Sequence, residues 1–552
     1  MQADTSRVES FDLNLATRNT LGDALHRVRS IFPERVAIID GERSFTYAEL
    51  DGTAESLAQG LLDLGLERGT PVAMLMSNCY EVFTTYFGVV KAGLALLPIN
   101  IGLAPEDVGW ILQDSKSSTV VVDENLLPLL RAAMKTEGVE VENIVIRHNG
   151  ASKASADAAP LDSTVQVRDL AELSATPVTS DDGRVQVHIE DHDIAQCLYT
   201  SGTTSRPKGS LGRHSSVVTA AFSNALMLGH QWGEDPGSMV SVLPLFHVTA
   251  LNTLCFPLLF TGGTIVLVTP FDPRAVLDAT EKYKIKLLIG LPMMWAALVE
   301  EQERQPRDLS SVHTAVYAMA QMSETLLKKV SDMMPNARVI LGSGQTEVLP
   351  ATVIQWAEHE HTKPGSWGLP SPTVEVSIMT PDGAIAPRGE TGEIVYRGPH
   401  VTSGYWNRPD ANEEAFAHGW FHSGDIGWMD DEGVVWFVDR LKDIIKSGGE
   451  NVSSVKVERV VSGAPGVVEC SVIGTYHERW GEAVTAVVTT DQLPPTDDPG
   501  RYAAAEKLAD EIIAYARERL SGFETPKRVE FIEEFPKTTT GKIRKLELRE
   551  YF

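Results

Sequence analysis

Short apolar runs alternate with longer amphipathic stretches from about residue 70 to residue 341. Residues 80–92 carry apolar side chains at helical spacing, and stretches of this kind separate runs that predict buried strands. The predicted strands are residues 72–76, 94–99, 120–122, 239–243, 264–268, 287–289, 315–319 and 339–341. Alternating strands and helices are typical of parallel sheets covered by helices on their faces. Such sheets bind ligands in the loops beyond the carboxyl ends of their strands.

The pattern changes in three other regions of the chain. Residues 150–184 are rich in Ala, Ser, Asp and Pro, which is typical of a surface excursion or mobile loop rather than a domain boundary. After about Gly365, short strands with Gly and Pro turns predict a small β-rich subdomain. A last unit from near Asp439 combines strand-like runs, a helix over residues 504–520, a strand over residues 529–532 and a basic tail.

Composition narrows the classes of partner. The 552 residues are too many for one core, so more than one domain is expected. With 75 acidic and 48 basic residues the formal charge is −27, which disfavours nucleic acid and anionic lipid as partners. An anionic ligand would therefore need local Lys and Arg. No signal-like start and no bilayer-length apolar run is seen, which predicts a cytoplasmic protein without a membrane span.

The strongest chemical signal is the segment YTSGTTSRPKG at residues 199–209. Glycines and small hydroxyl residues let a backbone approach an anion closely, and a lysine adds charge. It is not a Walker loop, because Pro207 precedes Lys208 and Gly209 follows it. The plain alternative, a Ser/Thr/Gly surface turn, fits eleven such residues poorly. The candidate phosphate-binding residues are Thr200, Ser201, Gly202, Thr203, Thr204 and Lys208.

This segment resembles the phosphate-binding loop of the adenylate-forming superfamily, which holds acyl- and aryl-CoA synthetases, peptide-synthetase adenylation domains and luciferases. The resemblance extends from about Gly22 to Lys545. In the matching motif GQTE at residues 344–347 it implies that Gln345 binds nucleotide, that Thr346 contacts the α-phosphate and that Glu347 helps to hold Mg²⁺.

Two later motifs carry further implied roles. GWFHSGD at residues 419–425 resembles the motif whose aspartate, here Asp425, binds both ribose hydroxyls, and Arg440 matches an arginine that contacts ribose and phosphate. PKTTTGKIR at residues 536–544 resembles the loop that supplies the catalytic lysine, here Lys542. An ammonium between a carboxylate and an anionic α-phosphate offsets their repulsion and stabilises the transition state.

The superfamily uses two orientations of a small C-terminal domain, and the matching hinge residue is Lys442. Rotation would remove Lys542 and bring SGGEN at residues 447–451 toward the site. Lys446, Gly448 and Gly449 are the candidate residues for coenzyme A, since glycines let a pantetheine arm pass close to backbone. The similarity of KSGGENVSSVKVE to CoA ligases is the main reason to propose CoA as the acceptor.

The acid-binding site follows from the same resemblance. His247 matches a residue that lines the acyl channel, although a lone His beside apolar residues is usually a core histidine. The small residues Ala318, Ala320, Gly342 and Gly344 would leave room for a bulky acid. The His359-Glu-His361 stretch is interpreted as a solvated loop and not as a zinc site.

Two residues depart from the superfamily pattern. Ser205 stands where a glycine is usual and Ser343 stands where an aromatic residue often stacks on adenine. Each costs about 1 kcal/mol, as backbone strain at Ser205 and as lost stacking at Ser343. Neither change removes a charge that the chemistry needs.

We therefore predict an α/β protein with an N-terminal domain over residues 1–439 and a small mobile α+β C-terminal domain over residues 440–552. The N-terminal domain would combine two layered α/β lobes with the β-rich subdomain. The predicted enzyme is an acyl-CoA synthetase that uses ATP, Mg²⁺, coenzyme A and a small-molecule carboxylic acid, with an acyl-adenylate intermediate. The candidate catalytic residues are Lys542, Thr346, Glu347 and His247.

Three alternatives stay open from the sequence. The acceptor could be a carrier-protein thiol, an amine or oxygen instead of CoA. The chain could be a non-catalytic nucleotide-binding protein, or a different enzyme such as a P-loop ATPase, which would release ADP. The identity of the acid and the oligomeric state, a homodimer included, are not fixed by the sequence.

Overall fold

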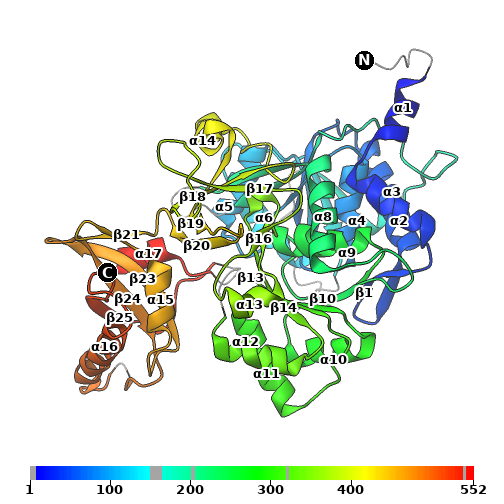
Figure 1. Ribbon diagram of the computed structural model, residues 1–552. Coiled ribbons are helices and arrows are strands. Elements are labelled where there is room, and N and C mark those ends of the chain that lie inside the picture. The colour runs from blue at the N-terminus through cyan, green and yellow to red at the C-terminus, as the bar shows by residue number, and fades with distance from the viewer. Residues whose placement is uncertain (1–7, 150–164, 201–205, 319–321, 496, 539–541) are drawn as a thin grey trace. The chain divides into compact units, whose positions relative to one another are not determined.

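The chain folds into two compact units in the computed structural model, which describes residues 8–149, 165–200, 206–318, 322–495, 497–538 and 542–552 (Figure 1). Within these residues, unit 1 runs to Thr200, continues over Arg206–Glu375 and ends with Tyr396–Phe421. Unit 2 comprises Val376–Val395 and His422–Phe552. The α/β fold class is confirmed, whereas the domain boundary between residues 439 and 440 stays a prediction.

Unit 1 contains a seven-stranded sheet. Its strands are β3 (Pro71–Leu75), β4 (Ala95–Pro98), β5 (Thr119–Asp123), β6 (Asn143–Arg147), β7 (Gln166–Asp169), β8 (Ile194–Thr200) and β9 (Lys208–Arg213). They run in the order β7-β6-β5-β3-β4-β8-β9. Every neighbouring pair is parallel except β8 and β9, which form an antiparallel hairpin at one edge.

A nine-stranded sheet completes the β-structure of unit 1. Its strands are β1 (Val36–Asp40), β2 (Arg43–Thr46), β10 (Ser238–Ser241), β11 (Thr264–Leu267), β12 (Leu287–Gly290), β13 (Thr314–Ala318), β14 (Arg338–Ser343), β15 (Val353–Ile354) and β16 (Leu369–Pro370). The order is β16-β15-β14-β13-β12-β10-β11-β1-β2, and the pairs from β14 through β1 are parallel. The eight strands predicted from apolar runs are thereby confirmed.

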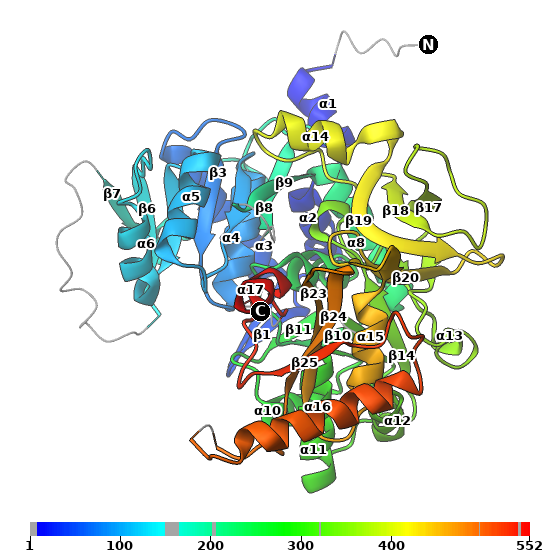
Figure 2. The same cartoon turned by 90° about the vertical axis from the view of Figure 1, so that its left-hand side faces the viewer.

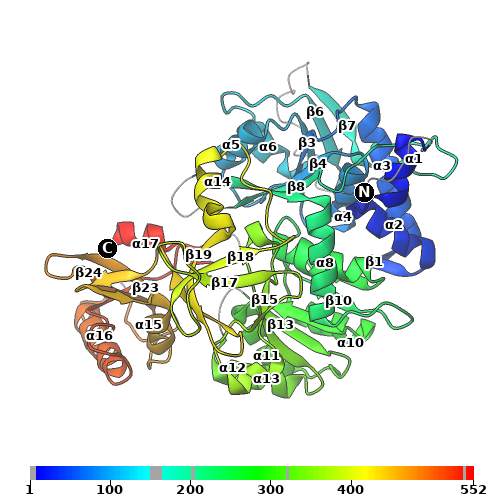
Figure 3. The same cartoon turned by 45° about the horizontal axis from the view of Figure 1, so that its top comes forward.

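The described residues of unit 1 also form α-helices. They are α1 (Ser10–Thr17), α2 (Leu21–Ile31), α3 (Tyr47–Asp63), α4 (Tyr80–Lys91), α5 (Pro105–Ser115), α6 (Leu127–Ala133), α7 (Leu170–Leu173), α8 (His214–Leu228), α9 (Phe256–Phe260), α10 (Pro273–Tyr283), α11 (Pro292–Arg304), α12 (Glu324–Met333), α13 (Ala357–Thr362) and α14 (Pro409–Ala415). One core joins α2, α3, α4 and α8 to strands of both sheets, and a second core joins α5 and α6 to the other face of the seven-stranded sheet (Figure 3).

Unit 2 holds two smaller sheets. The first, which lies mostly in this unit, has the order β17 (Glu375–Met379), β18 (Gly392–Arg397), β19 (Phe421–Met429), β20 (Val435–Arg440). The second contains β21 (Ile445–Ser447), β22 (Glu450–Val452), β23 (Glu469–His477), β24 (Gly481–Thr489) and β25 (Arg528–Phe531). Helices α15 (Ser454–Val461) and α16 (Arg501–Arg517) share a core with one face of the second sheet, and α17 (Lys545–Tyr551) packs on the other face (Figure 2).

The interpretation of residues 150–184 as one surface excursion is wrong in its second half. Residues 165–184 include β7, which pairs in parallel with β6, and the short helix α7. The strand has the sequence QVRD, so it lacks the apolar run that marked the other strands. Tertiary pairing at the sheet edge, rather than local hydrophobicity, determines its structure.

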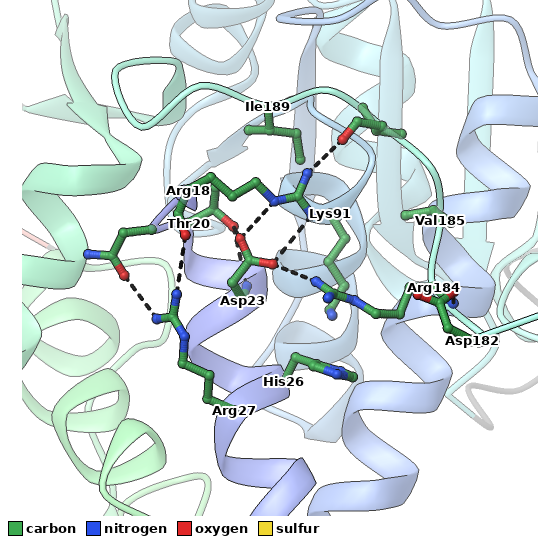
Figure 4. A network of polar contacts seen from close by, with 12 residues as sticks. Arg18, Thr20, Asp23, His26, Arg27, Lys91, Asp182, Arg184, Val185 and Ile189 are labelled. Atoms are coloured by element: carbon green, nitrogen blue, oxygen red, sulfur yellow. Dashed lines mark hydrogen bonds and ion pairs between the residues drawn. The ribbon is translucent and has the colours of Figure 1, made fainter. Parts of the chain in front are cut away.

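A buried ionic network then fixes the chain after residue 181 against α2 (Figure 4). Asp23 accepts from Arg18 Nε at 2.9 Å and from Arg184 Nη2 at 2.5 Å, and Arg18 Nη1 donates to the carbonyl of Val187 at 2.7 Å. Burial alone would raise the pKa of Asp23, but the Thr20 hydroxyl and both arginines lower it. This network therefore attaches the chain around Arg184 and Val187 to the start of α2.

The interpretation of His359-Glu-His361 as a solvated loop is also wrong. These residues belong to α13, and His359 is buried with its ring stacked on Trp356. The element is one short helix, which the adjacent polar residues did not reveal. No helix among the described residues combines the length and apolar content needed to cross a bilayer.

Candidate active site

The β8–β9 hairpin frames the predicted phosphate loop. Thr200 and Lys208 are direct partners across the hairpin, and residues Ser201, Gly202, Thr203 and Thr204 lie outside the described residues. Strand β9 follows the loop and leads directly into α8. The loop therefore leaves and re-enters one antiparallel ladder, which keeps its two ends together.

Helix α5 holds the far end of this loop. Trp110 Nε1 donates to the carbonyl of Pro207 at 3.3 Å, and the Arg206 guanidinium lies 4.5 Å from the centre of the Trp110 ring. Asp114, one turn further on, accepts from the Tyr199 hydroxyl at 2.7 Å. Both described ends of the loop are thus attached to the same helix.

The motif at residues 344–347 forms a tight turn after β14. Gly344 has φ +149°, and a Cβ there would lie 2.9 Å from the Cα of Pro350, so only glycine fits. Thr346 and Glu347 belong to a single 3₁₀ turn. The side-chain nitrogen of Gln345 is buried without a hydrogen-bond partner among the described residues. A buried amide nitrogen calls for an acceptor, which a bound ligand would supply.

Tyr405 joins the phosphate loop to the carboxylate of this motif. Its hydroxyl donates to Glu347 Oε1 at 3.0 Å, and Lys208 Nζ lies 5.3 Å from the centre of its ring. The backbone nitrogen of Thr402 donates to the carbonyl of Glu347 at 2.7 Å. The structure therefore brings Lys208, Thr346 and Glu347 together within unit 1.

The candidate acid-binding residues occupy two places in unit 1. Ala318 and Gly342 are direct partners in the parallel pair β13–β14, while Ala320 lies outside the described residues. A Cβ on Gly342 would meet only Val316 Cγ1, at 3.8 Å, so the glycine leaves space beside the strand. His247 precedes a π-helix over Thr249–Cys255, and its Nδ1 accepts from the backbone nitrogen of Thr249 at 3.2 Å. π-Helical turns are frequent at functional sites.

The serine at the adenine position has a structural partner. Ser343 Oγ donates to the carbonyl of Val353 at 3.0 Å, which fixes its side chain toward β15. The hydroxyl thus supports the antiparallel extension of the sheet rather than offering a stacking surface. Ser205, the other departure, lies outside the described residues.

Unit 2 brings Asp425 and Arg440 together. They are direct partners in the antiparallel pair β19–β20, and Arg440 Nε lies 2.7 Å from Asp425 Oδ1. The side chain of Asp425 is 5% exposed and that of Arg440 is 41% exposed. The Ser423 hydroxyl accepts from the backbone nitrogen of Asp425 at 3.0 Å. The Asp425 carboxylate is therefore buried, whereas the Arg440 side chain is accessible to solvent.

The predicted CoA segment is a two-residue hairpin turn. Ser447 and Glu450 are partners across β21–β22, and the residues between them, Gly448 and Gly449, have φ +63° and +90°. Positive φ at both central positions is the geometry that glycine favours in such turns. Lys446 lies exposed beside the turn, and the backbone nitrogen of Gly448 donates to the carbonyl of Trp480 at 2.8 Å.

Lys542 sits at the base of another hairpin of unit 2. The backbone nitrogen of Thr538 donates to the Lys542 carbonyl at 2.8 Å, and the Lys542 nitrogen donates to the Thr538 hydroxyl at 3.1 Å. The Lys542 side chain is exposed. The hinge candidate Lys442 follows β20 and is exposed as well.

Two family models match this chain. The model of the AMP-binding enzyme matches residues 25–406, and the model of the AMP-binding enzyme C-terminal domain matches residues 456–542. The chain belongs to the AMP-binding enzyme family. This AMP-binding enzyme is 34% identical over 520 residues to a feruloyl-CoA synthase of Amycolatopsis sp, covering 94% of the chain and 96% of the relative.

Further similarities span both units of the AMP-binding enzyme. It is 32% identical over 535 residues to a long-chain-fatty-acid–CoA ligase of Mycobacterium tuberculosis, covering 96% of the chain and 98% of the relative. The crystal structure of ATP-bound MatB from Rhodopseudomonas palustris matches with a TM-score of 0.80 at 26% identity, covering 96% and 98% of the two chains. The predicted membership of the adenylate-forming superfamily is confirmed.

The sequence of this AMP-binding enzyme did not predict the contacts that Tyr405 makes. The signal was present, because Gly404-Tyr-Trp406 places two aromatic residues beside a glycine in an otherwise polar stretch. No local feature of the sequence shows that Tyr405 pairs with residue 210. This pairing places the Tyr405 ring beside Lys208. The same holds for Trp110 and Asp114, which are helical residues without motif character.

Proposed function

We propose that the protein is an AMP-forming acid–CoA ligase. A carboxylate oxygen attacks the α-phosphorus of ATP, pyrophosphate leaves, and the acyl-adenylate forms. The thiol sulfur of CoA then attacks the acyl carbonyl carbon, and AMP leaves with the electron pair of the broken C–O bond. The observation that carries the proposal is that CoA synthases and ligases align with at least 94% of this chain at 30% identity or more.

The described contacts of unit 1 support the proposed binding of triphosphate and Mg²⁺. Lys208 supplies a cation at the base of the phosphate loop, and Gln345 offers a buried donor without a partner among the described residues. The Tyr405 hydroxyl donates to Oε1 of Glu347, and no described residue hydrogen-bonds to Oε2. One carboxylate oxygen is therefore available to a hard cation. Mg²⁺ there would neutralise charge on the departing pyrophosphate. Thr346 would contact the α-phosphate.

Unit 2 would supply the sugar contacts and the mobile charge. Asp425 can accept from adjacent ribose hydroxyls, and Arg440 is open enough to reach ribose and phosphate. Lys542 would stabilise the pentacoordinate phosphorus during adenylation. The predicted domain boundary lies between residues 439 and 440. In the second step, rotation of the C-terminal domain about Lys442 would replace Lys542 by the turn at Gly448 and Gly449. Lys446 would then lie beside CoA.

The acid is proposed to be larger than acetate or propionate. Ala318 and Gly342 leave side-chain volume free along one strand pair, whereas a Cβ on Gly344 would meet Pro350. The relatives named above are a feruloyl-CoA synthase and a long-chain-fatty-acid–CoA ligase. A fatty or aryl acid is the corresponding substrate class for this chain, with His247 and Ala320 in the same pocket. We place this metabolism in the cytoplasm.

The test is a panel of carboxylic acids, from acetate to aryl and long-chain acids, scored for pyrophosphate release with and without CoA. Acid-dependent pyrophosphate release that turns over only with CoA is the expected result. Turnover with a carrier-protein thiol or an amine but not with CoA would contradict the proposed acceptor. Absence of AMP with every acid would indicate a non-catalytic nucleotide-binding protein.

A further inference from the structure

Helix α17 begins three residues after the proposed catalytic lysine and contacts the proposed hinge. Arg549 Nη2 lies 3.4 Å from the carbonyl oxygen of Lys442 and 3.3 Å from Asp443 Oδ1. Its Nε is buried and has no hydrogen-bond partner among the described residues. The guanidinium is thus directed at the hinge segment, residues 439–443, from the helix that carries the chain on from Lys542.

Lys545 gives α17 a second attachment, one that leads to the start of the same hinge segment. Its Nζ lies 2.8 Å from Glu458 Oε1 and 2.6 Å from Ser454 Oγ, both on α15, and the side chain is 17% exposed. The backbone nitrogen of Ser454 donates to Asp439 Oδ2 at 2.5 Å. The other oxygen of Asp439 accepts from the backbone nitrogen of Arg440 at 2.7 Å.

The charges around Lys545 make this attachment a strong one. Burial disfavours the ammonium, but Glu458, Asp439 and Asp443 favour it, and the pKa of Lys545 is raised in sum. The lysine therefore stays charged at neutral pH. Charge-assisted hydrogen bonds between partly buried groups are about twice as strong as neutral ones.

The body of α17 is anchored independently of these charges. Leu548 is fully buried among Ile473, Val487 and Phe535, on the face of the sheet opposite α16. The chain before the helix is closed by the hydrogen bonds between Thr538 and Lys542. One rigid helix thus lies between the hairpin of Lys542 and the hinge segment.

We propose that Lys545 and Arg549 are positioning residues that couple the hinge segment to the catalytic lysine. They fix the direction of Lys542 relative to Lys442, so that a turn at the hinge moves Lys542 as part of one body. The inference rests on the proposed function for its kinetic consequence. The adenylation step needs Lys542 in place, whereas thioester formation from acyl-adenylate does not.

The first test is kinetic and uses the full-length protein. Arg549→Ala and Lys545→Ala should lower acid-dependent pyrophosphate release about tenfold or more, the size of one lost charge-assisted contact. Thioester formation from supplied acyl-adenylate and CoA should change by less than about twofold. Arg549→Lys should restore part of the pyrophosphate release, because it returns a cation near Asp443.

Arg519→Ala is the matched control. Arg519 also donates to a backbone carbonyl, that of Tyr515 at 2.9 Å, and pairs with a carboxylate, that of Glu518 at 3.1 Å, but at the end of α16. It should leave both half-reactions within about twofold of the wild type, with thermal unfolding measured for all variants. Equal losses in both half-reactions of Arg549→Ala, or equal losses in Arg519→Ala, would overturn the inference.

A second measurement does not depend on enzyme activity. Limited trypsin digestion should cut after Lys442 several times faster in Arg549→Ala than in the wild type or in Arg519→Ala, since the carbonyl of Lys442 loses its partner. Unchanged cleavage would refute the coupling. A wild-type protein without pyrophosphate release but with this cleavage pattern would refute the proposed function alone.

Discussion

Two sets of charged residues in this molecule look alike in distance and differ in exposure. In unit 1, Arg18 Nε lies 2.9 Å from Asp23, and in unit 2, Arg440 Nε lies 2.7 Å from Asp425. The Arg18 side chain is 7% exposed and shares its aspartate with a second arginine, whereas that of Arg440 is 41% exposed. A short Arg–Asp distance therefore says nothing about whether a pair stabilises the fold or awaits a ligand.

The same contrast separates two lysines. Lys91 Nζ lies 2.8 Å from Asp51 and 2.5 Å from Glu55 with all three side chains almost fully buried, while Lys542 is exposed on a hairpin. A buried charge that is held by both of its partners has a structural role. An exposed cation can exchange water for a phosphate at little cost. Among these arginines and lysines, exposure rather than pairing distinguishes the cations that we assign to chemistry.

The largest expected effect is that of Lys542→Ala. Acid-dependent pyrophosphate release should fall roughly 10³-fold, because one preorganised charge at a developing anion is lost. The free energy of unfolding should stay within about 0.5 kcal/mol of the wild type, as for other exposed residues. Pyrophosphate release and urea unfolding measure the two quantities. Equal loss of thioester formation from supplied acyl-adenylate would discredit a role confined to adenylation.

Lys91→Met should show the opposite pattern. It leaves Asp51 and Glu55 buried without their cation, which should cost about 3 kcal/mol of stability by urea unfolding. In buffer the folded fraction should keep its KM for ATP. A variant as stable as the wild type would show that the buried network does not support the fold.

Asp425→Asn should lower kcat/KM for ATP about 30-fold, since a neutral amide replaces the acceptor of two ribose hydroxyls. The matched change Asp23→Asn should instead lower stability, because its carboxylate serves two buried arginines. The measurements are ATP-dependent kinetics and thermal unfolding of both variants. If Asp425→Asn mainly lowered stability, the division between the two pairs would fail.

Acid should weaken the buried network of Asp51, Glu55 and Lys91. Burial would raise the pKa of Asp51, but Lys91 and the hydrogen bond with His26 lower it to about 2. A carboxylate with a depressed folded pKa stabilises the fold above its unfolded pKa, so this stability is present above about pH 4 and is lost as the pH falls toward 2. The loss should be roughly 2 kcal/mol.

Urea unfolding between pH 5 and about pH 2 measures this loss, with Asp51→Asn as the comparison. The variant lacks the titrating carboxylate, so its stability should fall less steeply with acid. Parallel curves for the two proteins would place the acid sensitivity elsewhere in the molecule.

The sequence predicts well where a pattern is local. The family, the α/β class and the eight parallel-sheet strands all follow from runs and motifs that a short window contains. It fails where pairing rather than apolar content determines a strand: β9, with the sequence KGSLGR, has little apolar content and forms because it pairs with β8. Strand β7, with the sequence QVRD, escapes prediction for the same reason, because it pairs with β6.

The candidate site divides in the same way. Lys208, Glu347, Asp425, Arg440 and Lys542 could be picked out because motifs mark them. The residues that hold them in place, Tyr405 beside Lys208 and Arg549 beside Lys442, lie 197 and 107 positions away along the chain. A motif fixes the reacting group, but only the fold identifies its support.

The most direct test of the account is the identity of the nucleotide product. Purified protein with Mg²⁺, ATP, CoA and an accepted acid should form AMP and acyl-CoA in equal amounts, as separated by chromatography. Formation of ADP and inorganic phosphate instead would contradict attack at the innermost phosphorus. It would also contradict the roles proposed for the Asp425–Arg440 pair and for Lys542.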